Sequence, residues 1–408
     1  MNDTHWKRNF AILWAGQAVS VLTSSILQMA LIWHLTTTTQ SATVLSLASL
    51  AGFLPNAVLG MIAGALVDRV SRKTAMIGAD LFIAGVSLVL VFASMDGELP
   101  VWLILVVLAV RSVGTAFHTP AITATAPLLV PVEELTKSAG YTHSLQTIGF
   151  IAGTAIASVL YPIWSISAMV ALDVVGAVVA CVAVTVIPIP KVERRSGSLN
   201  TNIWGEMKEG YQALKQERGL YAILWTAAVF MILYSPVNAL FPLMSLDYFG
   251  GTTVHASIAE IAFAVGMLSG SMLIGVKGAY KNKGLGIPCS VAMMGVPIWL
   301  SGLLPVSGFW IFAVFCAVMG LSVPFYNAPT TALYQERIAP EYLGRVFGLY
   351  GSVCSMAMPI GLVISGIFAD RVGTPKWFAI TGILITILAV GMYLIPSIRG
   401  IDQKQHER

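Results

Sequence analysis

Long apolar segments alternate with short polar turns along the whole chain. Each apolar segment is about as long as the roughly 20 residues that an α-helix needs to cross a bilayer. The pattern therefore predicts twelve membrane-spanning helices. Their expected ranges are 10–34, 42–66, 75–95, 101–122, 139–161, 166–188, 219–243, 255–276, 286–304, 309–330, 345–367 and 377–396.

The predicted spans form two groups of six, because the longest polar stretch lies between the sixth and the seventh. We expect an all-α integral membrane protein made of two six-helix, pseudo-symmetric halves. The expected parts are an N-terminal half at 1–188, a cytoplasmic central loop at 189–217, a C-terminal half at 218–396 and a cytoplasmic tail at 397–408. The second part of the central loop has helical spacing that is typical of a helix on a membrane surface.

Weak internal similarity supports the two halves. Leu13-Trp14 recurs 211 positions later as Leu224-Trp225, and Pro120 recurs 209 positions later as Pro329. The two offsets are nearly equal and join matching spans. Parallel six-span repeats are typical of transporters, whose substrate site lies near the bilayer midplane between the halves.

The composition excludes several classes of protein. The chain has 408 residues, of which 57% are hydrophobic and only 10% are charged, whereas a soluble domain carries about 25% charged residues. A soluble enzyme, a nucleic-acid-binding protein and a disordered scaffold are therefore excluded. The sequence holds neither an ATP-binding loop nor a metal-ligand cluster, so we expect no cofactor, no metal site and no direct use of ATP.

The positions of the basic residues predict the orientation. Of the 23 Lys and Arg residues, only Arg371 and Lys376 fall in outer segments, and Arg111 lies within a span. All the others fall in segments that are cytoplasmic if the N-terminus is cytoplasmic. Because basic residues concentrate in cytoplasmic loops, we expect both termini in the cytoplasm.

The loop after the second span carries a specific motif. It reads GALVDRVSRK from Gly64 to Lys73 and resembles the signature loop of the major facilitator superfamily, with Ser71 in the place of a glycine. Arg111 and Gly114 are similar to that superfamily's motif in the fourth span. The equivalent loop of the second half, at 275–284, has Ala279 where the acid is expected.

This resemblance implies a conformational latch made of Gly64, Asp68, Arg69 and Arg72. In the superfamily the acid faces the positive N-terminal end of the eleventh span, which begins here near Arg345. The contact closes the cytoplasmic side of the transporter. Basic residues at a span end also satisfy the positive-inside rule by themselves, but that reading does not explain Asp68.

Residues 6–80 resemble macrolide-type efflux permeases, a drug:proton antiporter branch. The resemblance implies a secondary active transporter of the bacterial cell membrane that exports amphiphilic, macrolide-like drugs in exchange for protons by rocker-switch alternating access. It implies a small amphiphilic substrate, the lipid bilayer as surroundings, a proton gradient as energy source, and a monomer. An importer or a lipid or metabolite permease of the same fold is the alternative. The signature loop and the repeat argue against a non-transporting receptor.

Four charged residues lie inside predicted spans and are the candidates for proton coupling. They are Asp80, Arg111, Asp173 and Glu260. A buried charge in a span is costly and faces the protein interior or a water-filled cavity. Each acid could instead reach the membrane interface or cap a helix, and Arg111 could be a structural tie.

Polar and aromatic residues at helical spacing are candidates for lining a substrate cavity. They are Gln17, Ser24, Gln28, Tyr234, Asn238, Phe241, Tyr326 and Asn327. Small polar residues also mediate ordinary helix packing, and most Met and aromatic residues belong to the core. His118, in the fourth span, is a further candidate sensor or ligand.

Overall fold

The structure of the chain is a computed structural model that describes residues 3–67, 70–95, 99–131, 135–189, 203–277 and 282–402. In these ranges every regular element is a helix. The chain divides into two compact units, one made of Met1–Thr39 and Leu47–Ser196, the other of Gln40–Ser46 and Gly197–Arg408. The second unit thus includes the first turn of the second helix.

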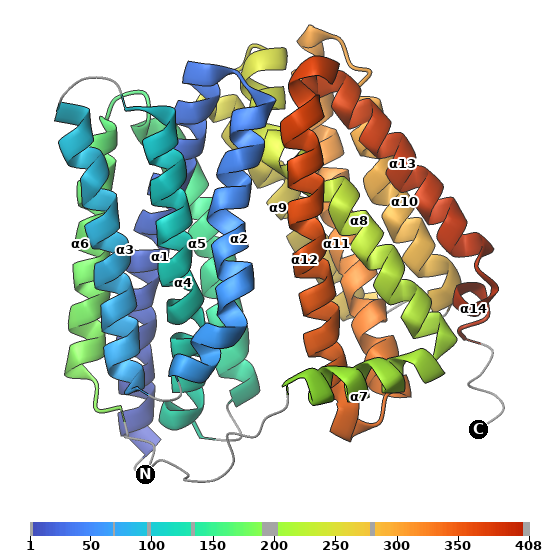
Figure 1. Cartoon of the computed structure of the whole chain (residues 1–408), viewed down its shortest axis with the longest axis horizontal. Coiled ribbons are helices and arrows are strands. Elements are labelled where there is room, and N and C mark those ends of the chain that lie inside the picture. Colours follow the sequence, from blue (N-terminus) through green and yellow to red (C-terminus); the bar gives the residue numbers. More distant parts are fainter. Residues whose placement is uncertain are drawn as a thin grey trace. The chain divides into compact units, whose positions relative to one another are not determined.

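The first unit holds most of the six long helices of the N-terminal part (Figure 1). Their bounds are α1 (Asp3–Thr39), α2 (Ala42–Val67), α3 (Arg72–Met95), α4 (Val101–Leu129), α5 (Leu135–Leu160) and α6 (Ile166–Val186). Helix α1 packs against α5 and α6, while α3 packs against α4 and α6.

The second unit holds six more long helices and a shorter one that precedes them. The bounds are α7 (Ile203–Gln216), α8 (Arg218–Leu243), α9 (Thr253–Lys277), α10 (Lys283–Ser301), α11 (Phe309–Arg337), α12 (Pro340–Val372), α13 (Thr374–Leu394) and the short α14 (Pro396–Arg399). A π-helical turn at Met244–Tyr248 follows α8, and a 3-10 turn at Val306–Gly308 precedes α11. Helix α7, predicted from its helical spacing, lies across the ends of α8 and α12 (Figure 1).

Eleven described helices are long and apolar enough to cross a membrane. The remaining predicted span, 139–161, falls on α5, where Ile148–Leu160 is a shorter apolar helix. The structure therefore agrees with the predicted spans in type and order. The count of twelve and the cytoplasmic position of both termini stay predictions.

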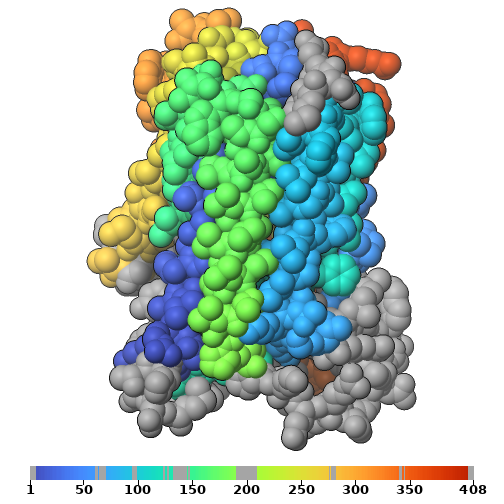
Figure 2. Space-filling view, turned by 90° about the vertical axis from the view of Figure 1, so that its left-hand side faces the viewer, coloured from blue at the N-terminus to red at the C-terminus, as the bar shows by residue number. Residues whose placement is uncertain are grey.

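The outer face of α6 is apolar, as a lipid-facing surface requires. Val175, Val178, Val182 and Val186 are 49–65% exposed, and they recur at helical spacing. Figure 2 shows α6 open to the outside along its length, between α1 and α3. The opposite face, which includes Asp173, is buried. The charged residue of α6 therefore points into the unit.

Small residues let α6 approach α1 closely. A Cβ atom built on Gly176 would collide with Thr23 Oγ1, and one on Gly16 would collide with Cβ of Ala183. Small residues at helix contacts allow such close approach in membrane proteins. This approach brings the polar face of α1 to Asp173.

The first turn of α2 is held by a carboxylate from α12. The Asp370 side chain accepts hydrogen bonds from the Ser41 hydroxyl at 2.7 Å, from the Ala42 amide and from the Thr43 amide at 3.2 Å. The first amides of a helix lack partners within the helix, and its N-terminus carries partial positive charge. The Asp370 carboxylate accepts hydrogen bonds from these amides and places a negative charge at the positive helix end. Helix α12 therefore anchors the start of α2.

Candidate functional site

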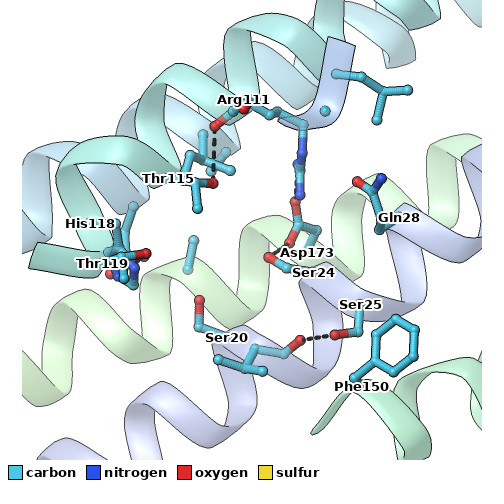
Figure 3. A pocket seen from close by; sticks show the side chains of 18 residues that line it. Ser20, Ser24, Ser25, Gln28, Arg111, Thr115, His118, Thr119, Phe150 and Asp173 are labelled. Carbon is cyan, nitrogen blue, oxygen red and sulfur yellow. Dashed lines mark hydrogen bonds and ion pairs between the residues drawn. The ribbon is translucent and has the colours of Figure 1, made fainter. Parts of the chain in front are cut away.

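Polar side chains of the first unit converge on a cavity of about 400 Å³. Residues from each of the helices α1 to α6 line it. In Figure 3, Arg111 extends toward Asp173 and Ser24, while His118 and Thr119 lie further along α4. Because the rest of this unit is strongly apolar, this cavity is the first candidate site.

One part of the cavity wall is an ion pair. Arg111 Nη1 on α4 lies 2.6 Å from Asp173 Oδ2 on α6, and both side chains are over 90% buried. Asp173 also accepts hydrogen bonds from Ser24 of α1 at 2.6 Å and from Ser87 of α3 at 3.4 Å. Arg111 donates to Ser87 as well. Both oxygens of Asp173 are thus occupied, and the two charges cancel.

A second acid lies in the same cavity with fewer contacts. Asp80 of α3 is 3% exposed, and its Oδ1 lies 3.0 Å from His118 Nε2 of α4. These two atoms do not form a hydrogen bond, and their contact is an ion pair when His118 is protonated. The other oxygen of Asp80, Oδ2, is buried and finds no hydrogen-bond donor within the described part of the chain.

The spacing along the helices separates the two pairs. Asp80 and Ser87 are seven residues apart on α3, and Arg111 and His118 are seven residues apart on α4. Seven residues are about two helical turns, or roughly 10.5 Å, on one helix face. The cavity wall therefore has two polar levels: the Arg111–Asp173 level and the Asp80–His118 level. This shared spacing is visible in the sequence, although it does not reveal the partners.

Three of the predicted cavity residues lie on α1 of this unit. Ser24 and Gln28 line the cavity. Gln17 is only 3% exposed and lies outside the cavity lining. Its side-chain amide has no hydrogen-bond partner among the described residues. Helix α1 thus contributes hydroxyl and amide groups, but its described lining residues carry no charge.

The second unit contains a cavity of a different character, with a volume of about 420 Å³. Its described lining residues are aromatic, methionine, aliphatic or small polar, and none is charged. Met231, Met267, Met294 and Met358 lie in its wall. Flexible, polarisable methionine side chains adapt to ligands of varied shape. This cavity is suited to the apolar body of an amphiphile.

Four of the predicted substrate residues meet in this second cavity: Tyr234 and Asn238 from α8, and Tyr326 and Asn327 from α11. The Tyr326 hydroxyl lies 3.4 Å from that of Tyr350 on α12. The two asparagines and the tyrosines supply the few hydrogen-bonding groups of an otherwise apolar wall. Such a wall can orient a ligand without carrying charge.

Two other predicted residues of this unit lie outside the cavity lining. Phe241 packs against Phe312 of α11, with ring centroids 5.2 Å apart. Glu260 lies on α9, and its side chain is half-buried. Neither side chain borders the cavity, so the proposed roles of both residues stay predictions.

The predicted latch is only partly described. Asp68 and Arg69 lie outside the described residues, while Gly64 belongs to the last part of α2 and Arg72 begins α3. Next to it, Lys73 donates to backbone carbonyls at the end of α6, where a cation is favourable. The latch itself stays a prediction.

The expected partner helix of the latch has a contact of its own. Arg345 of α12 forms an ion pair with Glu209 of α7, at 2.6 Å. Arg337, at the end of α11, lies 3.5 Å from Glu217, which follows α7. Helix α7 is thus tied by two ion pairs to the ends of α11 and α12. Sequence reasoning did not identify these contacts.

Comparison with known proteins points to one family. Residues 13–362 match the sequence profile of the Major Facilitator Superfamily. The chain is 54% identical over 400 residues to Macrolide efflux protein A of Streptococcus pyogenes, covering 98% of this chain and 99% of that protein. It is 55% identical over 322 residues to the protein of that name from Enterococcus faecalis, covering 79% of this chain and 99% of that protein.

A solved structure is similar in fold. The crystal structure of the nucleoside transporter NupG matches with a TM-score of 0.69 and 14% identity, over 96% of this chain and 98% of that chain. At this identity the likeness concerns the fold alone. Together with the family match, it confirms the predicted all-α membrane architecture.

Proposed function

The chain belongs to the Major Facilitator Superfamily, and from this premise we propose that it exports macrolide-like amphiphilic drugs in exchange for protons. Membership makes it a multi-pass transporter of the cell membrane rather than an enzyme. The predicted family resemblance is thereby confirmed. Drug export agrees with the macrolide efflux proteins to which it is 54–55% identical.

The difference between the two cavities carries this proposal. The cavity of the first unit has buried ionisable groups on three helices, α3, α4 and α6. The described lining of the second unit's cavity is uncharged and rich in aromatic and methionine side chains. An antiporter needs a group that gains and loses a proton, and an amphiphile needs an apolar surface. The first unit supplies the ionisable groups, and the second unit supplies the apolar surface.

Ionisable groups inside an apolar unit are suited to coupling with a proton gradient. A charge that crosses a membrane potential of about 150 mV gains roughly 3.4 kcal/mol. At about 1.4 kcal/mol per factor of ten, one proton per substrate supports a concentration ratio of a few hundred. The proton gradient is accordingly the proposed energy source, without a bound cofactor.

Proteoliposomes test the proposal directly. The purified protein is reconstituted, a macrolide gradient is applied, and the pH inside is followed with a dye. We expect macrolide movement in one direction to drive proton movement in the other, and an uncoupler to abolish uphill transport. Proton movement in the same direction as the substrate would favour the importer alternative. No response to a panel of macrolides and other amphiphiles would contradict drug export.

Alternating access by a rocker-switch movement is the proposed mechanism, with the signature loop as its latch. The test is Asp68→Asn, which removes the charge that the latch proposal places at the positive end of a helix. We expect reduced export at unchanged surface expression. The control is Ser71→Gly, which restores the superfamily's glycine in the same loop and keeps every charge. Full export by Asp68→Asn would contradict the latch.

A further inference from the structure

Asp80 is a buried acid that borders the cavity of the first unit. One of its oxygens faces His118 at 3.0 Å, and the other finds no hydrogen-bond donor in the described ranges. Asp173 differs, because Arg111, Ser24 and Ser87 already occupy its two oxygens. Of the two described acids that line the cavity, Asp80 is therefore the one with an oxygen that still lacks a hydrogen-bond donor.

We propose that Asp80 binds the ammonium group of a basic amphiphilic substrate, and that His118 carries a proton when this site is empty of substrate. The inference rests on the proposed function, because it names the chemical class of the substrate that the transporter exports. The apolar body of the substrate needs an apolar surface, which is a separate requirement. The cavity of about 400 Å³ is at the small end of ligand pockets, which span about 300–1,000 Å³, so it suits a head group.

The charges in the cavity explain why a cation would bind at Asp80. Arg111 and Asp173 cancel each other, which leaves the negative charge of Asp80 beside His118. The thiol of Cys181 on α6 is the other titratable group near Asp80. The described lining residues of α1, α2 and α5 are not titratable. With His118 neutral and no cation present, the cavity holds one uncompensated buried charge, which is costly.

Two states compensate this charge while Asp80 stays ionised. In one, the His118 imidazole is protonated and compensates Asp80. In the other, the substrate ammonium lies against Asp80, and the imidazolium N–H proton has been released to water. One proton leaves the protein for each cation that binds, and the cavity charge stays the same. The exchange therefore links substrate binding to proton release at a single site.

A matched pair of ligands tests the recognition of the amine. The probes are a macrolide with a tertiary amine and the same macrolide demethylated and acetylated at that nitrogen, which is uncharged. Binding to the purified full-length protein is measured at pH 7.5. We expect the wild type to prefer the basic macrolide by about ten- to hundredfold, the value of a lost charge-assisted contact. Asp80→Asn should bind both ligands equally, and Asp80→Glu should keep the preference.

The release of protons is measured with a cation that has no proton of its own. Tetramethylammonium, a permanent cation the size of a head group, is added to the protein in weakly buffered solution near pH 6, and the released protons are counted. We expect about one proton per bound cation for the wild type and none for His118→Gln. Glu336→Gln, which changes an exposed acid of the second unit, is the control and should release protons as the wild type does.

The outcomes separate this inference from the proposed function. A preference for the basic macrolide that survives in Asp80→Asn, at wild-type melting temperature, would overturn the inference and leave drug export standing. Cation binding without proton release by the wild type would overturn the exchange at His118. A wild type that exports neither macrolide but releases a proton on binding tetramethylammonium would contradict the proposed substrate and support the cation site.

Discussion

Arg111 Nη1 and Asp173 Oδ2 lie 2.6 Å apart, on two helices whose outer surfaces are apolar. Neither charge is tolerable alone at this depth, because an unpaired charge inside a membrane protein is expensive. Together with Ser24 and Ser87 they join α1, α3, α4 and α6 through one set of hydrogen bonds. The pair is therefore a structural tie as well as a wall of the cavity.

Removing one member of this pair should destabilise the protein strongly. Asp173→Asn leaves Arg111 buried without its countercharge, which costs about 3–5 kcal/mol. We expect a lower melting temperature of the purified protein and lower surface expression. The double variant Arg111→Met/Asp173→Leu removes both charges and should recover most of the stability. An Asp173→Asn protein as stable as the wild type would contradict the structural role of the pair.

The close contact between α1 and α6 should depend on the size of a single residue. A Cβ atom at Gly176 collides with Thr23, whereas one at Gly78 on α3 meets open space. Gly176→Ala should therefore cost about 1–3 kcal/mol by overpacking. Gly78→Ala should stabilise α3 slightly, since Ala favours a helix over Gly by about 0.8–1.0 kcal/mol. Both melting temperatures are measured in one detergent, and equal effects would contradict the predicted contact.

The spans could be predicted from the sequence because each helix that crosses the bilayer needs about 20 mostly apolar residues. Apolar length can be read from a single segment, so α3 and α6 begin and end within three residues of their expected ranges. Helix α4 begins at its expected residue but continues to Leu129, past the expected end at 122. The embedded charges Asp80, Arg111 and Asp173 are identifiable by the same rule. All three line one cavity of the first unit.

The partners of these charges could not be predicted, because they depend on how the helices rotate and pack. Arg111 and Asp173 are 62 positions apart, and nothing local relates them. Tyr234 and Phe241 are seven residues apart and were expected to line the same surface. The second cavity includes Tyr234 but not Phe241, because it extends only part of the way along α8. How far the cavity extends along α8 depends on how the helices pack against one another.

The carboxylate at the start of α2 should contribute measurably to stability. Asp370 accepts hydrogen bonds from Ser41 and from two backbone amides, and loss of a helix cap costs about 0.5–2 kcal/mol. Asp370→Ala, which removes every accepting oxygen of this side chain, is therefore expected to lower the melting temperature by a few degrees. The matched control is Arg371→Gln, which changes the exposed neighbouring residue and should have no effect. Equal melting temperatures for the two variants would rule out the cap.

The same pair of aromatic residues on α8 allows substrate binding to be separated from packing. Tyr234 lines the second cavity, while Phe241 packs against Phe312 away from it. Both are large aromatic residues of one helix, so truncation of either removes a similar apolar area. Tyr234→Ala should raise the macrolide concentration for half-maximal transport by about tenfold, because an aromatic contact with the ligand is lost. Phe241→Ala should lower the melting temperature and leave that concentration unchanged. If Phe241→Ala weakens macrolide binding as much as Tyr234→Ala does, the second cavity is not where the apolar body of the substrate binds.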